Sequence, residues 1–180
     1  MPDMANPAGS ITLEKHQIPS HGLIPNTAPH GLPFTVYRSA FPASTPPEVV
    51  EKTLKGNGWS PAWRYPMYKT SHFHSTTHEA LVVIAGAAEL LVGGDDNPDA
   101  ASVTVRRGDA MFMPVGVAHR LVREVDGREF TMVGAYPDGA EQWDMCYGRE
   151  GEDDVREKVK DVAGQTVSDP VLGGALGDGA

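Results

Sequence analysis

The sequence predicts an all-β domain, a sandwich or barrel of short strands. From residue 63 onward, short apolar and β-branched runs recur about every 8 to 12 residues, which is the spacing of strands in such folds. Turn residues separate these runs, and the chain as a whole holds 20 glycines and 15 prolines. A clear helix signal occurs at one place, so alternating strands and helices around a parallel sheet are disfavoured.

The N-terminal part carries little regular pattern. Residues 1–31 are rich in Pro, Gly, Ser, Asn and His, and we expect an extended arm with a short strand at Ile11 to Leu13. A helix is predicted over residues 46–56, with Thr45 as its N-cap, proline in the first turn and Gly56 at its end.

The barrel is expected to span residues 32–148. Its predicted strands are Trp63 to Lys69, Glu79 to Ala85, Ala88 to Val92, Ser102 to Arg106, Ala110 to Met113, His119 to Val125 and Phe130 to Tyr136. Residues 149–180 form an acidic, Gly-rich tail, which we expect to pack on the surface or to be partly disordered. The chain therefore reads as one domain with two tails.

Composition excludes several classes of partner and site. The 180 residues hold 15 Lys and Arg against 24 Asp and Glu, a net charge of −9, so nucleic acid and membrane surfaces are not expected partners. The single cysteine, Cys146, excludes an intramolecular disulfide and a thiolate zinc cluster. No secretion signal is recognisable at the N-terminus, and the longest apolar stretch is too short to span a bilayer. We expect a cytoplasmic protein.

Four of the seven histidines fall within the β region, three of them between residues 72 and 78. In an extended chain, residues two apart share a face, so His72 and His74 can offer two imidazoles to one ion. Glu79 opens an apolar run, where a carboxylate needs a positive partner such as a divalent cation. His119, about forty residues on, begins another predicted strand and completes a mixed nitrogen and oxygen ligand set. The alternative is that these histidines are hydrogen-bonded core residues or an exposed pair without function.

The spacing of these residues resembles the two motifs of the cupin superfamily. The first motif has His-x-His followed by Glu and Gly, and the second has Gly, Pro-x-Gly and His at fixed intervals. The matching residues in this chain are His72, His74, Glu79, Gly86, Gly108, Pro114, Gly116 and His119. Further residues between positions 57 and 148 resemble the small single-domain YjlB-like cupins. The likeness covers roughly residues 30–175.

Two positions depart from the family pattern, and neither is a metal ligand in the family. Pro66 replaces the opening glycine of the first motif, and Arg123 replaces the closing asparagine of the second. By strand alternation Arg123 shares a face with His119, so it is a candidate to bind an anionic substrate inside the barrel, the alternative being a surface ion pair. Arg64 and Tyr68 share the parity of the histidine pair and are further candidates to bind substrate.

The resemblance implies a double-stranded β-helix, or jelly roll, whose mouth holds one divalent transition metal. Iron(II) is the first expectation, with Mn, Ni, Zn, Co or Cu also compatible with these ligands. It also implies a homodimer, and a second subunit is a candidate to cover the apolar side chains of Val82 and Ile84 on the outer sheet face.

The resemblance further implies a metal-dependent enzyme acting on a small organic molecule, with dioxygenase-like oxidation preferred and Glu79 as a candidate base. The alternatives are a non-redox isomerase, lyase or decarboxylase, and a non-catalytic metal- or ligand-binding cupin.

Overall fold

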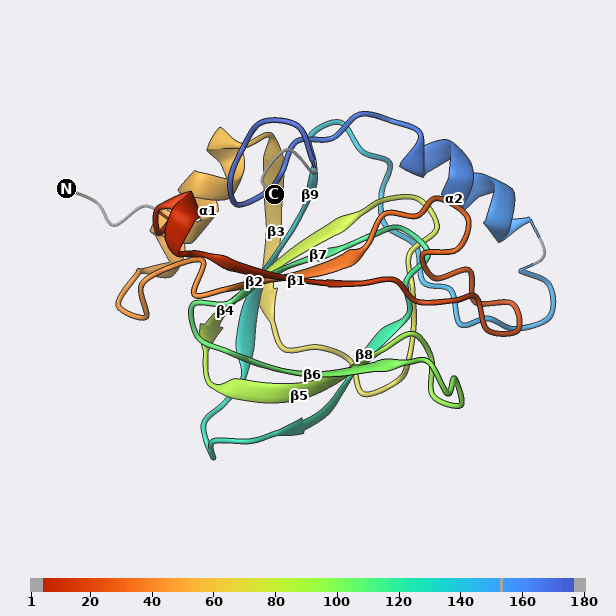
Figure 1. Cartoon of the computed structure of the whole chain (residues 1–180), viewed down its shortest axis with the longest axis horizontal. Coiled ribbons are helices and arrows are strands. Elements are labelled where there is room, and N and C mark those ends of the chain that lie inside the picture. Colours follow the sequence, from red (N-terminus) through yellow and green to blue (C-terminus); the bar gives the residue numbers. More distant parts are fainter. Residues whose placement is uncertain (1–4, 153, 177–180) are drawn as a thin grey trace.

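The computed structural model describes residues 5–152 and 154–176, so the first four residues of the arm and the last four of the tail lie outside the described part. It contains two antiparallel sheets that pack face to face as a jelly roll (Figure 1). The predicted all-β fold is confirmed. Among the described residues, neither α-helix is long and apolar enough to cross a membrane.

The larger sheet has six strands in the order β1-β2-β7-β4-β9-β3. Their bounds are β1 (Thr12–His16), β2 (Phe34–Arg38), β3 (Trp59–Tyr65), β4 (Glu79–Ala85), β7 (Ala110–Met113) and β9 (Thr131–Pro137). Strand β4 follows the segment that holds His72 and His74, and β7 precedes the turn that leads to His119. The two strands pair in register, with Glu79 opposite Met113. This pairing places the two predicted motifs at the same end of the sheet.

The smaller sheet has three strands in the order β6-β5-β8. They are β5 (Ala87–Val92), β6 (Ala101–Arg106) and β8 (His119–Glu124). The main core lies between the sheets, where Leu81 and Met111 from one side meet Leu90 and Val105 from the other. Burying these side chains is the dominant stabilising contribution, about 1.5–3 kcal/mol for each large apolar side chain.

The outer face of the six-stranded sheet is covered by other parts of the same chain. Helix α1 (Pro47–Gly56) and the segment around Val171 pack on Val82, and Ile84 lies at the edge of this second core. Figure 1 shows α1 and the blue segment that follows α2 on the side of this sheet away from β5 and β6. The apolar outer face therefore needs no second subunit as a cover, and the homodimer stays a prediction.

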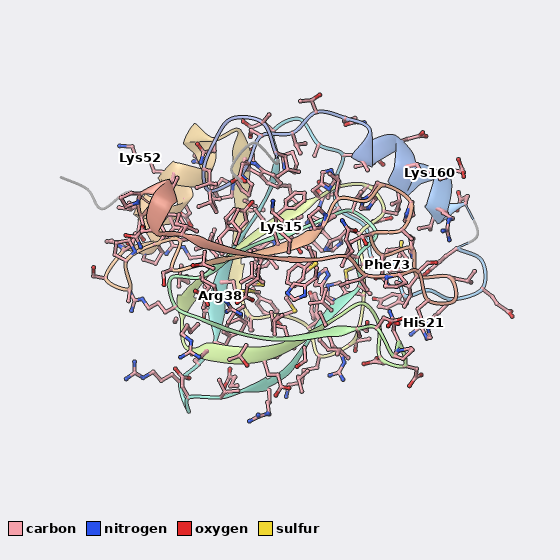
Figure 2. The ribbon with its side chains drawn as sticks, viewed as in Figure 1. Lys15, His21, Arg38, Lys52, Phe73 and Lys160 are labelled. Atoms are coloured by element: carbon pink, nitrogen blue, oxygen red, sulfur yellow. The ribbon has the colours of Figure 1, made fainter. Side chains whose placement is uncertain are left out.

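A second α-helix, α2 (Val155–Ala163), lies within the segment expected to be a tail. It buries Val155 and Val159 against Val115 and Phe73, which belong to the turns next to the predicted ligands. Figure 2 shows Phe73 at the same end of the molecule as α2. Helix α2 therefore supports the segments that carry the histidines.

Three local features differ from the prediction. Strand β2 was not predicted. Strand β3 begins at Trp59 instead of Trp63, because a proline at position 61 is unusual within a strand and hid its first residues from the sequence pattern. Pro61 is tolerated since β3 is an edge strand and has a register shift between Pro61 and Trp63. Thr45 is not the N-cap of α1: that position is Pro46, whose carbonyl accepts the first helical hydrogen bonds.

Candidate metal centre

The structure brings His72, His74 and His119 together. Each offers one ligand atom, and these atoms all lie within 4.8 Å of one another, with all three residues buried. The backbones of His72 and His119 form a bridge between their segments, while Phe73, between the first two histidines, points into the core beneath α2. The alternation expected from the His-x-His pattern therefore holds.

The same tautomer is fixed in all three imidazoles. Each Nδ1 lies within hydrogen-bond distance of a backbone carbonyl: His72 at 2.9 Å from Thr70, His74 at 2.5 Å from Asp144, and His119 at 2.9 Å from Val117. Since a carbonyl can only accept, Nδ1 carries the proton in each ring. The Nε2 lone pairs are left available, as in histidines that ligate a metal.

Glu79 lies beside this cluster at the start of β4 and is buried. Its two carboxylate oxygens lie 3.5 Å from Nε2 of His74 and 3.4 Å from Nε2 of His119. Burial acts to raise the pKa of Glu79, but the neighbouring His74 and His119 outweigh it and hold that pKa below its usual range. Glu79 is therefore a carboxylate that faces two of the three imidazoles.

These residues fit a divalent transition metal. Nε2 of His74 is buried and has no hydrogen-bond partner, which is costly unless something else binds its lone pair. Three imidazoles and one carboxylate are borderline to hard donors that suit Fe, Mn, Co, Ni, Cu or Zn alike. His72, His74, Glu79 and His119 are the residues that would hold the ion.

Tyr136 and Trp63, which were not predicted as site residues, form a hydrogen-bonded chain to Glu79. The Tyr136 hydroxyl donates to Oε1 of Glu79 at 3.0 Å and accepts from the Trp63 indole at 2.9 Å. The Trp63 ring fits because residue 134 is glycine, where a Cβ would lie 2.1 Å from it. Burial and then Glu79 raise the pKa of Tyr136, so its hydroxyl stays protonated and orients the carboxylate.

Asp144 ties a later loop to the first motif. Its carbonyl accepts from His74, and its carboxylate accepts from the backbone and the hydroxyl of Ser75 at 2.7 and 2.5 Å. Burial acts to raise the pKa of Asp144, but the hydrogen bonds from Ser75 lower it overall. Asp144 therefore fixes the ring of His74 without reaching the ligand atoms.

His78 does not join the cluster. Its Nδ1 accepts a hydrogen bond from the backbone of Val115 at 3.0 Å, and the carbonyl of Val115 lies 2.9 Å from Nε2 of His30. Burial, and then the neighbouring His30, lower the pKa of His78 to about 4, so it is neutral. His78 and His30 thus contact the backbone N–H and the carbonyl of Val115, and together they hold the turn that precedes His119.

A cavity of about 250 Å³ opens above the cluster and includes all three histidines and Glu79 in its lining. Arg64 and Tyr68, predicted as substrate-binding residues, both line it. Tyr68 is half-exposed at the mouth, whereas Arg64 is paired with Glu48 and Glu51 of α1 at 2.9 and 2.7 Å.

Arg123 does not line this cavity, so the prediction that it points into the barrel is wrong. Its side chain is 66% exposed and pairs with Glu89 on the surface at 2.8 Å. The cause is a register shift: Leu90 pairs with Leu121 but Glu89 pairs with Arg123, which leaves Val122 as an extra residue. The extra residue reverses the alternation after Leu121.

Metal binding is expected to weaken in acid. Burial lowers the pKa of His72 to about 3, but Glu79 outweighs burial at His74 and raises its pKa. Since Nδ1 of His74 is already protonated, the added proton occupies the ligand atom Nε2. Below the raised pKa of His74, the affinity for Zn²⁺ should fall at least about tenfold per pH unit. Titrations at several pH values measure the slope, and a constant affinity down to pH 4 would count against histidine ligation.

Loss of the Asp144 side chain is expected to weaken metal binding without unfolding the domain. Asp144→Ala removes the two hydrogen bonds that Ser75 donates to this carboxylate. Loss of such a supporting contact typically costs about 10–100-fold in metal affinity. Competition with a chelator measures the change. The matched control is Asp138→Ala, which removes a hydrogen bond to Ser60 on the exposed surface. Equal metal affinity in the two variants would refute the role of Asp144.

Comparison with known proteins gives the following similarities. Residues 66–134 match the family model described as “Cupin domain”. “Uncharacterized protein YjlB” of Bacillus subtilis (strain 168) is 32% identical over 155 residues, which is 86% of this chain and 87% of that protein.

Among solved structures, oxalate decarboxylase of Bacillus subtilis at pH 4.6 is 15% identical over 64% of this chain, with a TM-score of 0.38. Procruciferin, an 11S globulin of Brassica napus, is 19% identical over 46% of this chain, with a TM-score of 0.34. The matched parts cover 23% and 20% of those two chains.

Proposed function

The chain belongs to the cupin family, and from that premise we propose that it is a metal-dependent enzyme that oxidises a small organic molecule in a dioxygenase-like reaction. The observation that carries the proposal is the set of three imidazoles with one shared tautomer, which converge beside Glu79 at the base of a cavity. A bound transition metal supplies Lewis acidity and, if it is iron(II), redox chemistry with dioxygen.

The residues of this chain contribute orientation, proton acceptance and exclusion of water. Glu79 accepts a hydrogen bond from Tyr136 and lies at the floor of the cavity, so it is the residue we propose as acceptor of a proton from a substrate hydroxyl within reach. Trp63 holds the Tyr136 hydroxyl from the other side, which limits rotation of the carboxylate. The aromatic and methionine side chains around the cavity keep the polar floor poorly hydrated, which strengthens its electrostatic interactions.

Oxygen uptake by the iron-loaded protein tests this proposal. We expect consumption of dioxygen with at least one member of a panel of hydroxylated and carboxylated organic compounds. His119→Ala should abolish the uptake, and the matched surface variant Arg123→Ala should leave it unchanged. No uptake with any compound shown to bind would refute the oxidation and favour a non-redox isomerase, lyase or decarboxylase, or a binding protein.

A further inference from the structure

The cavity combines a polar floor with aromatic walls. The floor is formed by the three histidines and Glu79. The walls hold five aromatic side chains and three methionines, which are Trp63, Tyr65, Tyr68, Tyr136, Trp143, Met67, Met132 and Met145. Such walls favour contact with apolar, polarisable surface.

Two aromatic pairs contribute to these walls. Tyr136 and Trp143 lie nearly parallel, with ring centroids 6.4 Å apart and an interplanar angle of 18°, and Trp143 also lies edge-on to His74. Tyr65 and Tyr68 form a second pair, with centroids 5.6 Å apart, and each is 49% exposed. Exposed aromatic rings beside a cavity offer a ligand large, rigid contact area. A planar ligand would contact rings deep in the cavity and at its mouth.

The charges around the cavity argue against a small dianion. Among the described residues that line it, Arg64 is the one arginine or lysine, and two glutamates of α1 already neutralise it. Arg123 lies on the surface. A ligand with carboxylates at opposite ends would therefore place one of them against aromatic rings without a free cationic partner.

The size of the cavity limits the ligand further. Its volume of about 250 Å³ lies just below the ~300–1,000 Å³ typical of pockets for drug-sized ligands. Resting on the proposed function, we propose that the substrate is a planar aromatic compound of one or two rings. Its single oxygen-bearing end faces the histidines, and its ring contacts Trp143 and Tyr68.

Matched carboxylates test this inference without turnover. The probes are benzoate, cyclohexanecarboxylate and succinate, whose two carboxylates lie at opposite ends, titrated by calorimetry into the zinc-loaded protein, which cannot carry out redox chemistry. Benzoate and cyclohexanecarboxylate share one charge and one head group, and differ in the aromaticity of the ring. Benzoate should bind about two- to tenfold more tightly than cyclohexanecarboxylate, the range expected for favourable aromatic pairing, and more tightly than succinate.

Variants identify the side chains responsible. The double variant Trp143→Leu, Tyr68→Leu should bind benzoate and cyclohexanecarboxylate equally, while its zinc affinity stays unchanged as evidence of an intact site. The matched control Arg123→Ala, at an arginine that pairs with Glu89 on the surface, should leave the affinity for benzoate within about twofold. If the double variant no longer binds zinc, the two single variants are measured instead. Each should reduce the preference for benzoate over cyclohexanecarboxylate.

Several results would overturn the inference and remain distinguishable from failure of the oxidation. Equal affinities for benzoate and cyclohexanecarboxylate, or tighter binding of succinate than of benzoate, would each refute it. If the protein retains no metal, quenching of tryptophan fluorescence in the metal-free protein still compares the two ring compounds. A preference for benzoate without dioxygen uptake by the iron-loaded protein would refute the oxidation and leave the substrate class standing.

Discussion

His119→Ala should lose metal by more than about a hundredfold in affinity, because loss of a mere supporting contact already costs about 10–100-fold. The domain should stay folded, since the cores between and outside the two sheets do not depend on the ion. His74→Ala should behave in the same way. Metal content after dialysis measures the loss, and thermal unfolding of the metal-free proteins measures the stability.

The controls for this result are close in chemistry. His119→Gln keeps most of the side-chain volume and separates loss of the ligand from an unfilled space. His21→Ala removes a histidine of the N-terminal arm and should retain the metal. An unfolded metal-free His119→Ala, or one that keeps full metal occupancy, would contradict the assignment of the site.

Gly108→Ala is expected to cause the largest loss of stability among single methyl additions to the second motif. Gly108 has a φ of +96°, and a Cβ would lie 2.5 Å from the carbonyl oxygen of Phe41. The backbone strain costs about 1–3 kcal/mol and the overpacked contact about 1–3 kcal/mol, so the free energy of unfolding should fall by about 2–6 kcal/mol. Urea denaturation measures this change.

Gly127→Ala separates the two contributions. Gly127 also has a positive φ, of +70°, but a Cβ there would meet nothing within 4 Å. It should therefore lose only the strain contribution, about 1–3 kcal/mol. If both variants lose the same stability, the close contact between the Gly108 turn and Phe41 does not contribute.

The strands could be predicted where the signal is local. Strands β4 to β9 have apolar, β-branched runs bounded by turn residues, and the structure places all six within one or two residues of the expected positions. Strand β2 has a run of aromatic and β-branched residues that could have revealed it. Helix α2 was missed because its charged residues dominate the composition, although Val155 and Val159 are spaced for one buried face.

The candidate site, too, could be predicted only where the signal is local. His72, His74, Glu79 and His119 could be chosen from spacing and chemistry, because strand alternation and the pairing of β4 with β7 determine where they meet. Other contributions depend on contacts between distant segments. Trp143 and Asp144 reach the site because Phe73 pairs with Cys146, and no local pattern encodes that bridge.

The prediction for Arg123 failed because of a local irregularity in its strand. Strand alternation predicts its direction correctly only if the strand is regular, and the extra residue Val122 reverses it. The partner of Arg123, Glu89, lies on a strand more than thirty residues earlier in the chain. A single bulge of this kind changes a predicted substrate contact into a surface ion pair.

Anomalous diffraction from crystals of the metal-loaded protein tests the central claim most directly. We expect one strong anomalous peak at the floor of the cavity, within about 2.0–2.2 Å of Nε2 of His72, His74 and His119 and of a Glu79 oxygen. A peak elsewhere, or coordination through Nδ1 of any of these histidines, would contradict it.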